Sequence, residues 1–582
     1  MPPALPRRSA AAAFVATAVE SVTPVPDARS RAASRRAARA ARAAAANDAP
    51  DHDDPDTEAS RYEPPAPIPV STKAPSPALV DRAYAPRLAV AAVAPLATTS
   101  TRHSAAAPVS TPQALHLARR ATWGATPAQV AEIAGVGVGA WLDAQLNPLT
   151  AVPDAAMDQL VSTQWPRLAW KTWEVHDHYY PNSTGDLGYD VLQAYVARAL
   201  WSRRQLLEVM VDFWTNHLVV TAPWGESWDS VHRYHADVIR KFALGRYADM
   251  LVAAAKHPAM LAQLDNESST KRAPNENFGR EVLELHTVGV DGGYLESDIR
   301  RSALALTGMS TEDESGEYLY RQIRHHVGAL SLLGWSDANG SAQGEKVGEA
   351  YLTHLARHPK TARRLATKLA VRFVADSPPS ALVDRLTSVY LANDTRIAPV
   401  LKALFTSPEF AASAGQKTKR PLENMISTVR SLGATPGPDT KGWLDGLIWN
   451  ARTAGQAPMG WPAPNGYPDV APAWAGAGVM LAVWNWHMGQ GWTATQTTGI
   501  QVTYPALTTL LPSTLPATHG GLVDALATRL LQGPVPAATR DAICVFLGKT
   551  ATSPLRSTDA AVGWRLPYVV ALVLDTPEFA TR

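Results

Sequence analysis

The strongest concentration of residues that could do chemistry lies between Asn275 and Tyr294, a segment that reads NENFGREVLELHTVGVDGGY. On a helix, whose residues turn by roughly 100° each, one stripe of this segment carries Asn277, Arg280, Glu281 and Glu284. Two carboxylates one turn apart, beside an amide and a guanidinium, could hold a divalent cation or work as general acid and general base. The stripe therefore predicts a catalytic or metal-binding face. The alternative is an exposed face with an ordinary i,i+4 ion pair between Arg280 and Glu284.

Histidines could complete this face. His, Glu and Asn suit borderline or hard metals, and the candidate ligands are His217, Glu281, Glu284 and His286. Asn216 and the later His325 could join the same site, and Arg280 could hold an anionic substrate through two parallel hydrogen bonds. On an ideal helix, however, His286 lies roughly 200° from Glu284. It can join the carboxylates only if the helix unwinds there. Otherwise we expect it to cap the helix C-terminus, where the dipole favours it.

The remaining motifs carry weaker signals. His176 and His178 have the spacing of a metal clip in a loop, whereas the pairs His232/His235 and His354/His358 lack the glutamate of the H-E-x-x-H zinc motif. Cys544 is the single cysteine and sits in an apolar run, so it predicts a core position and excludes an intramolecular disulfide or an iron–sulfur cluster. The sequence contains no G-x-S-x-G elbow and no Walker loop.

The segments that must position these residues are helical by pattern. Apolar residues at helical spacing predict a long helix over 192–219 and further helices over 238–256, 361–374, 380–391 and 397–405. Gly289 and the turn that follows it predict the end of the signature helix, with Ser297 capping the next one. Strand-like alternation is scarce, and 317–324 is its best example. The predicted fold class is therefore mainly α.

Two features suggest how the body is organised. Residues 430–520 are rich in Gly, Pro and Trp, which predicts a loop-dominated region packed by aromatic side chains. An apolar helix followed by a Pro-Glu-Phe turn occurs at 400–410 and again at 572–579. This echo predicts a helical body over 111–582 with two subdomains, 111–430 and 431–582.

The first 110 residues differ in composition from the rest. All 18 tryptophans lie at or beyond Trp123, and the leader consists mainly of Ala, Pro, Ser and Arg, so it would bury too little surface to offset the entropy of ordering it. We therefore expect a disordered leader over 1–110. Arg7-Arg8 before an alanine-rich run, and Arg87 before a second apolar run, resemble weak export signals.

Charge and hydropathy exclude two classes of protein. The basic run at 29–42 and the acidic run at 48–58 cancel within a formal net charge of +2, so a generally basic nucleic-acid binder is not expected. No run approaches the roughly 18–20 apolar residues needed to span a bilayer.

Several segments resemble the bacterial family known as domain of unknown function 1800. The strongest is the signature Asn275–Tyr294. The others follow in family order: LARRATWGATP (117–127), DFWTNH (212–217), HPAM (257–260), ALALTG (303–308), HPKTARRLATKLAVRF (358–373), SPEF (407–410) and GWP (460–462). Family members commonly carry a His-Asp or His-Glu near the middle, followed by a Lys-containing loop. Here His325-His326-Val327-Gly328 takes that place.

The resemblance implies an α-helical, usually exported bacterial protein whose gene often neighbours that of a protein resembling sulfatases and alkaline phosphatases. It implies no established activity. Two functions stay open. The first is an exported enzyme, hydrolase-like or metal-dependent, with catalytic residues Asn277, Arg280, Glu281 and Glu284 under an aromatic lid from 443–492. The second is a non-catalytic periplasmic or cell-surface binding scaffold that partners the sulfatase-like protein, with the same charges as structural ion pairs. An enclosed pocket formed by Asn277, Glu281, Glu284 and His217 would favour the enzyme.

Overall fold

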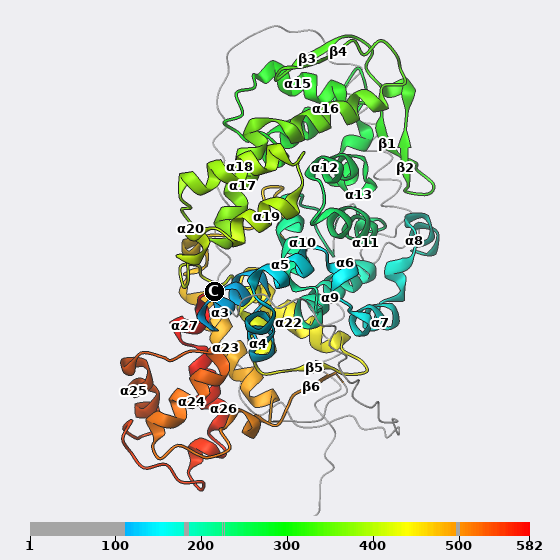
Figure 1. Ribbon diagram of the computed structural model, residues 1–582. Coiled ribbons are helices and arrows are strands. Elements are labelled where there is room, and N and C mark those ends of the chain that lie inside the picture. The colour runs from blue at the N-terminus through cyan, green and yellow to red at the C-terminus, as the bar shows by residue number, and fades with distance from the viewer. Residues whose placement is uncertain (1–110, 180–184, 224, 226, 496–500) are drawn as a thin grey trace, which may run out of the picture.

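The computed structural model describes residues 111–179, 185–223, 225, 227–495 and 501–582. The predicted leader, with both candidate export signals, lies outside the described residues. Across the described ranges helices dominate, and the strands form three two-stranded antiparallel sheets (Figure 1). The mainly α fold class is therefore confirmed. None of the described helices is both long and apolar enough to cross a bilayer.

The amino-terminal part is a series of helices joined by short turns. Thr126 accepts a hydrogen bond from the Gln129 N–H and Pro127 opens the next helix, as the Thr-Pro pair favours. The elements are α3 (Thr111–Ala121), α4 (Pro127–Val136), α5 (Val138–Leu146), α6 (Pro148–Ala151), α7 (Ala155–Gln164), η1 (Pro166–Ala169) and α8 (Thr172–Tyr179).

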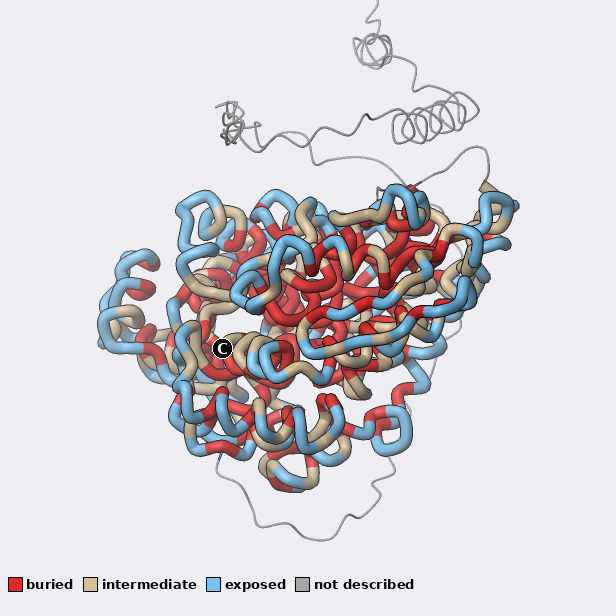
Figure 2. Tube along the Cα trace, turned by 90° about the horizontal axis from the view of Figure 1, so that it is seen from above, coloured by how far each residue is buried: buried red, intermediate tan, exposed pale blue. Residues whose placement is uncertain are grey.

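The long helix predicted over 192–219 is wrong, because the chain breaks it into α9 (Asp186–Trp201) and α10 (Gln205–His217). The Gln205 side chain explains the break. Its amide donates to the carbonyl oxygens of Ala199 and Ser202, which the end of α9 leaves without helical partners. Both helices are buried along most of their length and form the centre of the core, which Figure 2 shows enclosed by exposed chain.

The middle of the chain packs against α10. Here follow α11 (Val231–Arg233), the π-helix η2 (Tyr234–Arg240), α12 (Tyr247–Lys256), α13 (Pro258–Gln263), η3 (Asn266–Ser268), α14 (Glu276–Glu281), the π-helix η4 (Val282–His286) and α15 (Glu296–Ala305). The predicted Ser297 cap is wrong by two residues. Helix α15 begins at Glu296, and the Asp298 carboxylate accepts the Leu295 N–H.

Short strands and a second helical group follow. Strand β1 (Met309–Thr311) pairs with β2 (Tyr318–Tyr320), so the strand predicted over 317–324 is confirmed only in its first half. Strand β3 (Leu330–Leu332) pairs with β4 (Trp335–Asp337) after η5 (Gln322–Arg324). The helices that follow are α16 (Glu345–Arg357), α17 (Pro359–Phe373), α18 (Ser380–Ala392), α19 (Ile397–Phe405), α20 (Pro408–Ala411) and α21 (Pro421–Ser431).

The region 430–520 is less loop-rich than predicted. It contains α22 (Lys441–Thr453) and the 17-residue α23 (Ala477–Thr493), because its tryptophans pack from within helices: the rings of Trp443 and Trp486 lie 6.2 Å apart. The segment between them holds only the short η6 (Ala471–Trp474). The predicted subdomain boundary at 430/431 falls inside α21.

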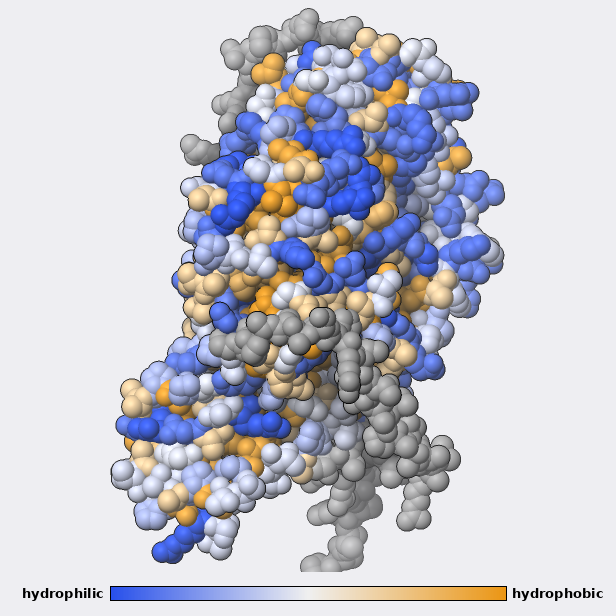
Figure 3. All heavy atoms as spheres, viewed as in Figure 1, coloured by the Kyte–Doolittle hydropathy of each residue, from blue (hydrophilic) through white to orange (hydrophobic). Residues whose placement is uncertain are grey.

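The last part closes against the rest of the body. It comprises β5 (Thr435–Pro436) paired with β6 (Val502–Thr503), η7 (Leu507–Leu510), α24 (His519–Leu531), α25 (Ala537–Phe546), η8 (Ala560–Val562), α26 (Leu566–Leu574) and α27 (Pro577–Ala580). The predicted echo is present in three dimensions. Both α19 and α26 are followed by a four-residue Pro-Glu-Phe-Ala helix whose phenylalanine is buried. Polar side chains cover most of the surface seen in Figure 3, with apolar residues scattered between them.

Candidate functional site

Three of the segments that carry the resemblance meet in the core. His217 is the last residue of α10, His286 the last residue of η4, and Lys368 lies in the middle of α17, while Tyr247 opens α12 between them. The rings of His217 and His286 lie 6.3 Å apart. Lys368 Nζ lies 2.9 Å from His217 Nδ1, and His217 Nε2 lies 3.1 Å from the Tyr247 hydroxyl. We call His217, Tyr247, His286, Arg364 and Lys368 the basic cluster.

The hydrogen bonds of this cluster fix where its protons lie. The Tyr247 hydroxyl donates to the backbone carbonyl oxygen of His286 at 2.5 Å, so it accepts from His217 Nε2–H. The Nδ1 of His217 then carries a lone pair that accepts a hydrogen bond from Lys368 Nζ. The result is one continuous chain of donors from Lys368 through His217 and Tyr247 to the backbone of η4.

Burial makes the cluster a poor place for positive charge. Burial, with a contribution from Arg364, lowers the pKa of Lys368 to about 7. Burial and the charges of Lys368 and Arg364 lower the pKa of His286 to about 3, and the same effects hold the pKa of His217 well below its usual range. Across the described ranges no carboxylate forms an ion pair with Lys368 or Arg364.

The predicted stripe lies beside this cluster but is divided. Glu284 accepts from the Tyr294 hydroxyl at 2.7 Å and lies 3.5 Å from Arg280, which also contacts Glu296 at 2.5 Å. The i,i+4 ion pair named as the alternative is therefore present. Glu281 is half-buried, and burial followed by the nearby Glu284 raises its pKa. Asn277 is exposed, so these residues do not form the enclosed pocket that would favour an enzyme acting through the stripe.

The helix does unwind where the predicted geometry required it. Residues Val282–His286 form a π-helix, and the Thr287 hydroxyl donates to the carbonyl oxygen of Val282, five residues back. His286 is turned into the core, where it is 2 % exposed, while Glu284 stays half-buried. Because burial keeps His286 neutral, it does not act as a charged cap on the helix dipole.

The four residues predicted as metal ligands are not gathered into one binding group. In the part of the chain that the structure describes, no three His, Cys, Asp or Glu side chains lie close enough together to hold a metal ion. The physical reason is charge. Both ring nitrogens of His217 are engaged in hydrogen bonds, and Lys368 and Arg364 would repel a cation at His286. The basic cluster suits an anion instead.

Two further predicted residues lie elsewhere. The Asn216 side chain holds the backbone of Tyr467, donating to its carbonyl oxygen at 2.8 Å and accepting its N–H at 2.6 Å. It therefore positions the loop after GWP against the end of α10. His325 is buried between the Thr307 carbonyl oxygen and the Asn339 side chain, away from the basic cluster. In the weaker clip motif, His176 pairs with Asp229 at 3.2 Å.

Pattern reasoning missed the cations of α17. Arg364 and Lys368 are one turn apart on a helix whose inward face is formed by Leu365 and Leu369 among others. A lysine next to buried leucines on an amphipathic helix was the available signal. Tyr247 carried no signal in its spacing, because its partner His217 comes from a distant segment. Tyr294 pairs with Glu284 inside the signature segment, across a turn that helical spacing does not describe.

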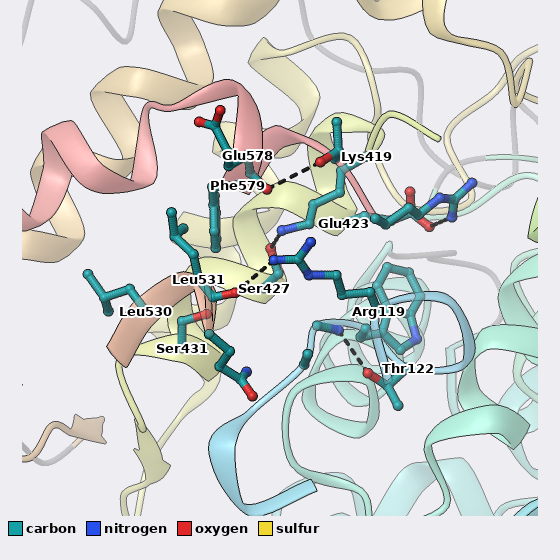
Figure 4. Close-up of a pocket in the computed structure, with 16 residues that line it drawn as sticks. Arg119, Thr122, Lys419, Glu423, Ser427, Ser431, Leu530, Leu531, Glu578 and Phe579 are labelled. Atoms are coloured by element: carbon teal, nitrogen blue, oxygen red, sulfur yellow. Dashed lines mark hydrogen bonds and ion pairs between the residues drawn. The ribbon is translucent and has the colours of Figure 1, made fainter. Parts of the chain in front are cut away.

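A second polar group in the interior is an ion-pair network. Glu423 forms ion pairs with Arg372, Arg420 and Arg582. Asp212 and Asp469 supply the further negative charges that these guanidinium groups contact. A narrow cleft lies next to it, with a volume of about 440 Å³ that includes the part open to solvent (Figure 4). In that cleft Lys419 donates to the Ser427 hydroxyl at 3.0 Å and lies over the ring of Phe579, while Arg119 donates to the Leu531 carbonyl oxygen. Because opposite charges are matched in the network, we assign it a structural role.

Comparison with known proteins identifies the family. The family described as "Protein of unknown function (DUF1800)" matches residues 116–581. Because this match spans most of the chain, the protein belongs to that family, as the sequence motifs predicted. No curated protein and no solved structure matches the chain.

Proposed function

We propose that this member of the DUF1800 family is an exported enzyme that catalyses acid–base chemistry of the hydrolase type at the basic cluster. The observation that carries the proposal is Lys368, a buried amine with a pKa near 7 that is hydrogen-bonded to His217. A group that is half-protonated near neutral pH can both accept and deliver a proton, which is what general acid–base catalysis requires. Perturbed pKa values of this kind concentrate at functional sites.

Each neighbouring residue has a place in the proposal. His217 and Tyr247 orient the Lys368 amine through the hydrogen-bond chain. Arg364, which has no ion-pair partner among the described residues, would hold a negatively charged group of the substrate. Glu281, whose pKa is raised, would be the second proton-transfer group, and Arg280 would hold the neighbouring Glu284 side chain in place through their ion pair.

The test is turnover by the full chain of a panel of p-nitrophenyl esters, phosphates, sulfates and glycosides. We expect hydrolysis of at least one negatively charged substrate, and a loss of about a hundredfold or more in kcat/KM in Lys368→Met. Lys346→Met is the matched control, since Lys346 is exposed and pairs with Glu349. No turnover of any substrate, or equal activity in Lys368→Met, would contradict the proposal.

A second candidate is the binding scaffold that partners the sulfatase-like protein. It is favoured by the ion pairs that Arg280 forms with Glu284 and Glu296, because these pairs engage the charges of Arg280 and Glu284 within the predicted catalytic stripe. Sedimentation of the purified chain with the purified neighbour protein tests this candidate. A stable complex with no turnover would support the scaffold, whereas two independently sedimenting species would count against it.

A further inference from the structure

A second cleft lies apart from the basic cluster, between α7, η1, α9 and η2. It measures about 1100 Å³, a volume that includes the part open to solvent. Figure 1 shows α7 and α9 among the cyan helices of the body, and α9 packs against both α7 and η1. The walls are mainly apolar and are formed by Val161, Trp165, Pro166, Leu168, Val191 and Ala194. Size and lining are those of a small-molecule site.

One cation in this cleft has no direct ion-pair partner. Arg198 lines the cleft from α9, and within the described part of the chain its guanidinium forms no hydrogen bond and no ion pair, while Glu208, Asp158 and Asp154 act on its charge only from a distance. Its neighbours are all satisfied: Arg240 forms two hydrogen bonds with Glu208, and Asp158, the acidic residue in the cleft wall, pairs with Arg204. Burial and the charge of Arg240 lower the pKa of Arg198 to about 9, so it stays charged at neutral pH.

Two histidines add unpaired polar atoms to the same wall. His235 is 4 % exposed, and its Nε2 is buried without a hydrogen-bond partner among the described residues. His232 donates from Nε2 to the Trp170 carbonyl oxygen at 2.8 Å, which leaves its buried Nδ1 as an acceptor that no described group fills. Buried polar atoms are normally paired, so two unpaired ring nitrogens behind the cleft wall make this wall unusually polar for its depth.

We infer that this cleft binds a small organic carboxylate, with the carboxylate on Arg198 and the apolar body against Val161, Leu168 and Val191. A guanidinium recognises a carboxylate through two parallel hydrogen bonds, and none of its donors is engaged elsewhere. The apolar walls would exclude a small hydrated ion such as acetate from tight binding, because such an ion leaves their surface uncovered. The site is independent of the proposed catalytic cluster.

The test is isothermal titration calorimetry of the full chain with octanoate near neutral pH, compared with octanamide and acetate. We expect octanoate to bind more tightly than either of the others. In Arg198→Met octanoate should bind about tenfold to a hundredfold more weakly, the effect of losing a charged hydrogen-bond partner, and Arg198→Lys should recover part of the loss. Arg300→Met is the control, because Arg300 pairs with Glu276 on the surface of another helix.

A second variant guards against a folding defect. Ala236 lines the cleft, so Ala236→Phe should block octanoate and octanamide alike while leaving Arg198 in place. Thermal unfolding of each variant checks that the fold is kept. The inference is overturned if octanoate does not bind the unmodified chain, if octanamide binds equally well, or if folded Arg198→Met binds octanoate unchanged.

Discussion

The Lys368 amine shares a hydrogen bond with His217 Nδ1 at 2.9 Å, and the lysine has no carboxylate partner among the described residues. The charge of a buried lysine is normally stabilised by an ion pair, but here the amine faces a neutral imidazole and the nearby Arg364. The stable arrangement is therefore a lysine that loses its proton near neutral pH. This relationship has consequences for stability that can be measured without knowing a substrate.

Replacing Lys368 by methionine should change how stability depends on pH. The folded pKa is about 7 and the unfolded value is 10.5, so between these values the unfolded chain binds a proton that the folded chain lacks. The stability of the unmodified protein should rise relative to Lys368→Met as pH increases from 7 to about 10, by on the order of 3 kcal/mol in total. Urea unfolding of both proteins at several pH values measures the difference, and parallel curves would show that the lysine is not buried as described.

His286 should change stability in the same direction as Lys368, but over a lower pH range. Its folded pKa is about 3 against 6.5 in the unfolded chain, so protonation of the unfolded state removes stability as pH falls from 6.5. His286→Phe keeps a ring and removes the titration, so its stability should fall less steeply between pH 6 and 4, by about 1 kcal/mol per pH unit. Urea unfolding over this range tests it. An unchanged slope would mean that His286 is solvated.

Glu423 should contribute strongly to stability. Burial alone would raise its pKa, but Arg372 and Arg420 lower it to about 2, so its contribution is present above about 4.5 and is lost as pH falls toward 2. Glu423→Gln removes the carboxylate that three buried guanidinium groups share. It should therefore lower the free energy of unfolding by about 3–5 kcal/mol near neutral pH. The control is Glu296→Gln, because the Glu296 side chain is 73 % exposed and its ion pair with Arg280 contributes about 1 kcal/mol or less. Similar losses in both variants would contradict the structural role of the network.

Gly466 should resist substitution because of its position against α10. It has a φ of 75°, and a Cβ there would overlap the Asn216 carbonyl oxygen. Gly466→Ala should therefore cost about 1–3 kcal/mol and release the loop that Asn216 holds. Gly489 in α23 has open space around it, so Gly489→Ala should instead stabilise by about 0.5–1 kcal/mol. Thermal unfolding of the two glycine variants measures these changes in stability. Equal effects in both variants would contradict the close contact between Gly466 and Asn216.

The sequence predicted the class of fold better than the positions at which helices end. Apolar spacing located α17, α18 and α19 almost to the residue because each has one buried face. It failed at 202–204, where α9 and α10 are both buried nearly all round, so the periodicity continues through the break. It also failed in 430–520, where tryptophans that suggested loops pack from helices.

For the candidate site, the sequence pattern predicted the helical segment but not its electrostatics. Spacing alone places Asn277 to His286 on one helix, and the need for unwinding at His286 follows from the same angles. The cations beside His286, Arg364 and Lys368, lie about 80 residues further along the chain. Tertiary packing decides which half-buried groups from distant segments come together in the core. Spacing within one segment does not contain that information.

The π-turn at Val282–His286 holds one residue more than an α-turn would. If the same residues closed into regular α-helix, everything beyond the turn would rotate by roughly 100°. His286 would then leave the face that meets His217, and Gly289 would no longer lie against Arg364. The width of this turn is thus as much a part of the site as its side chains.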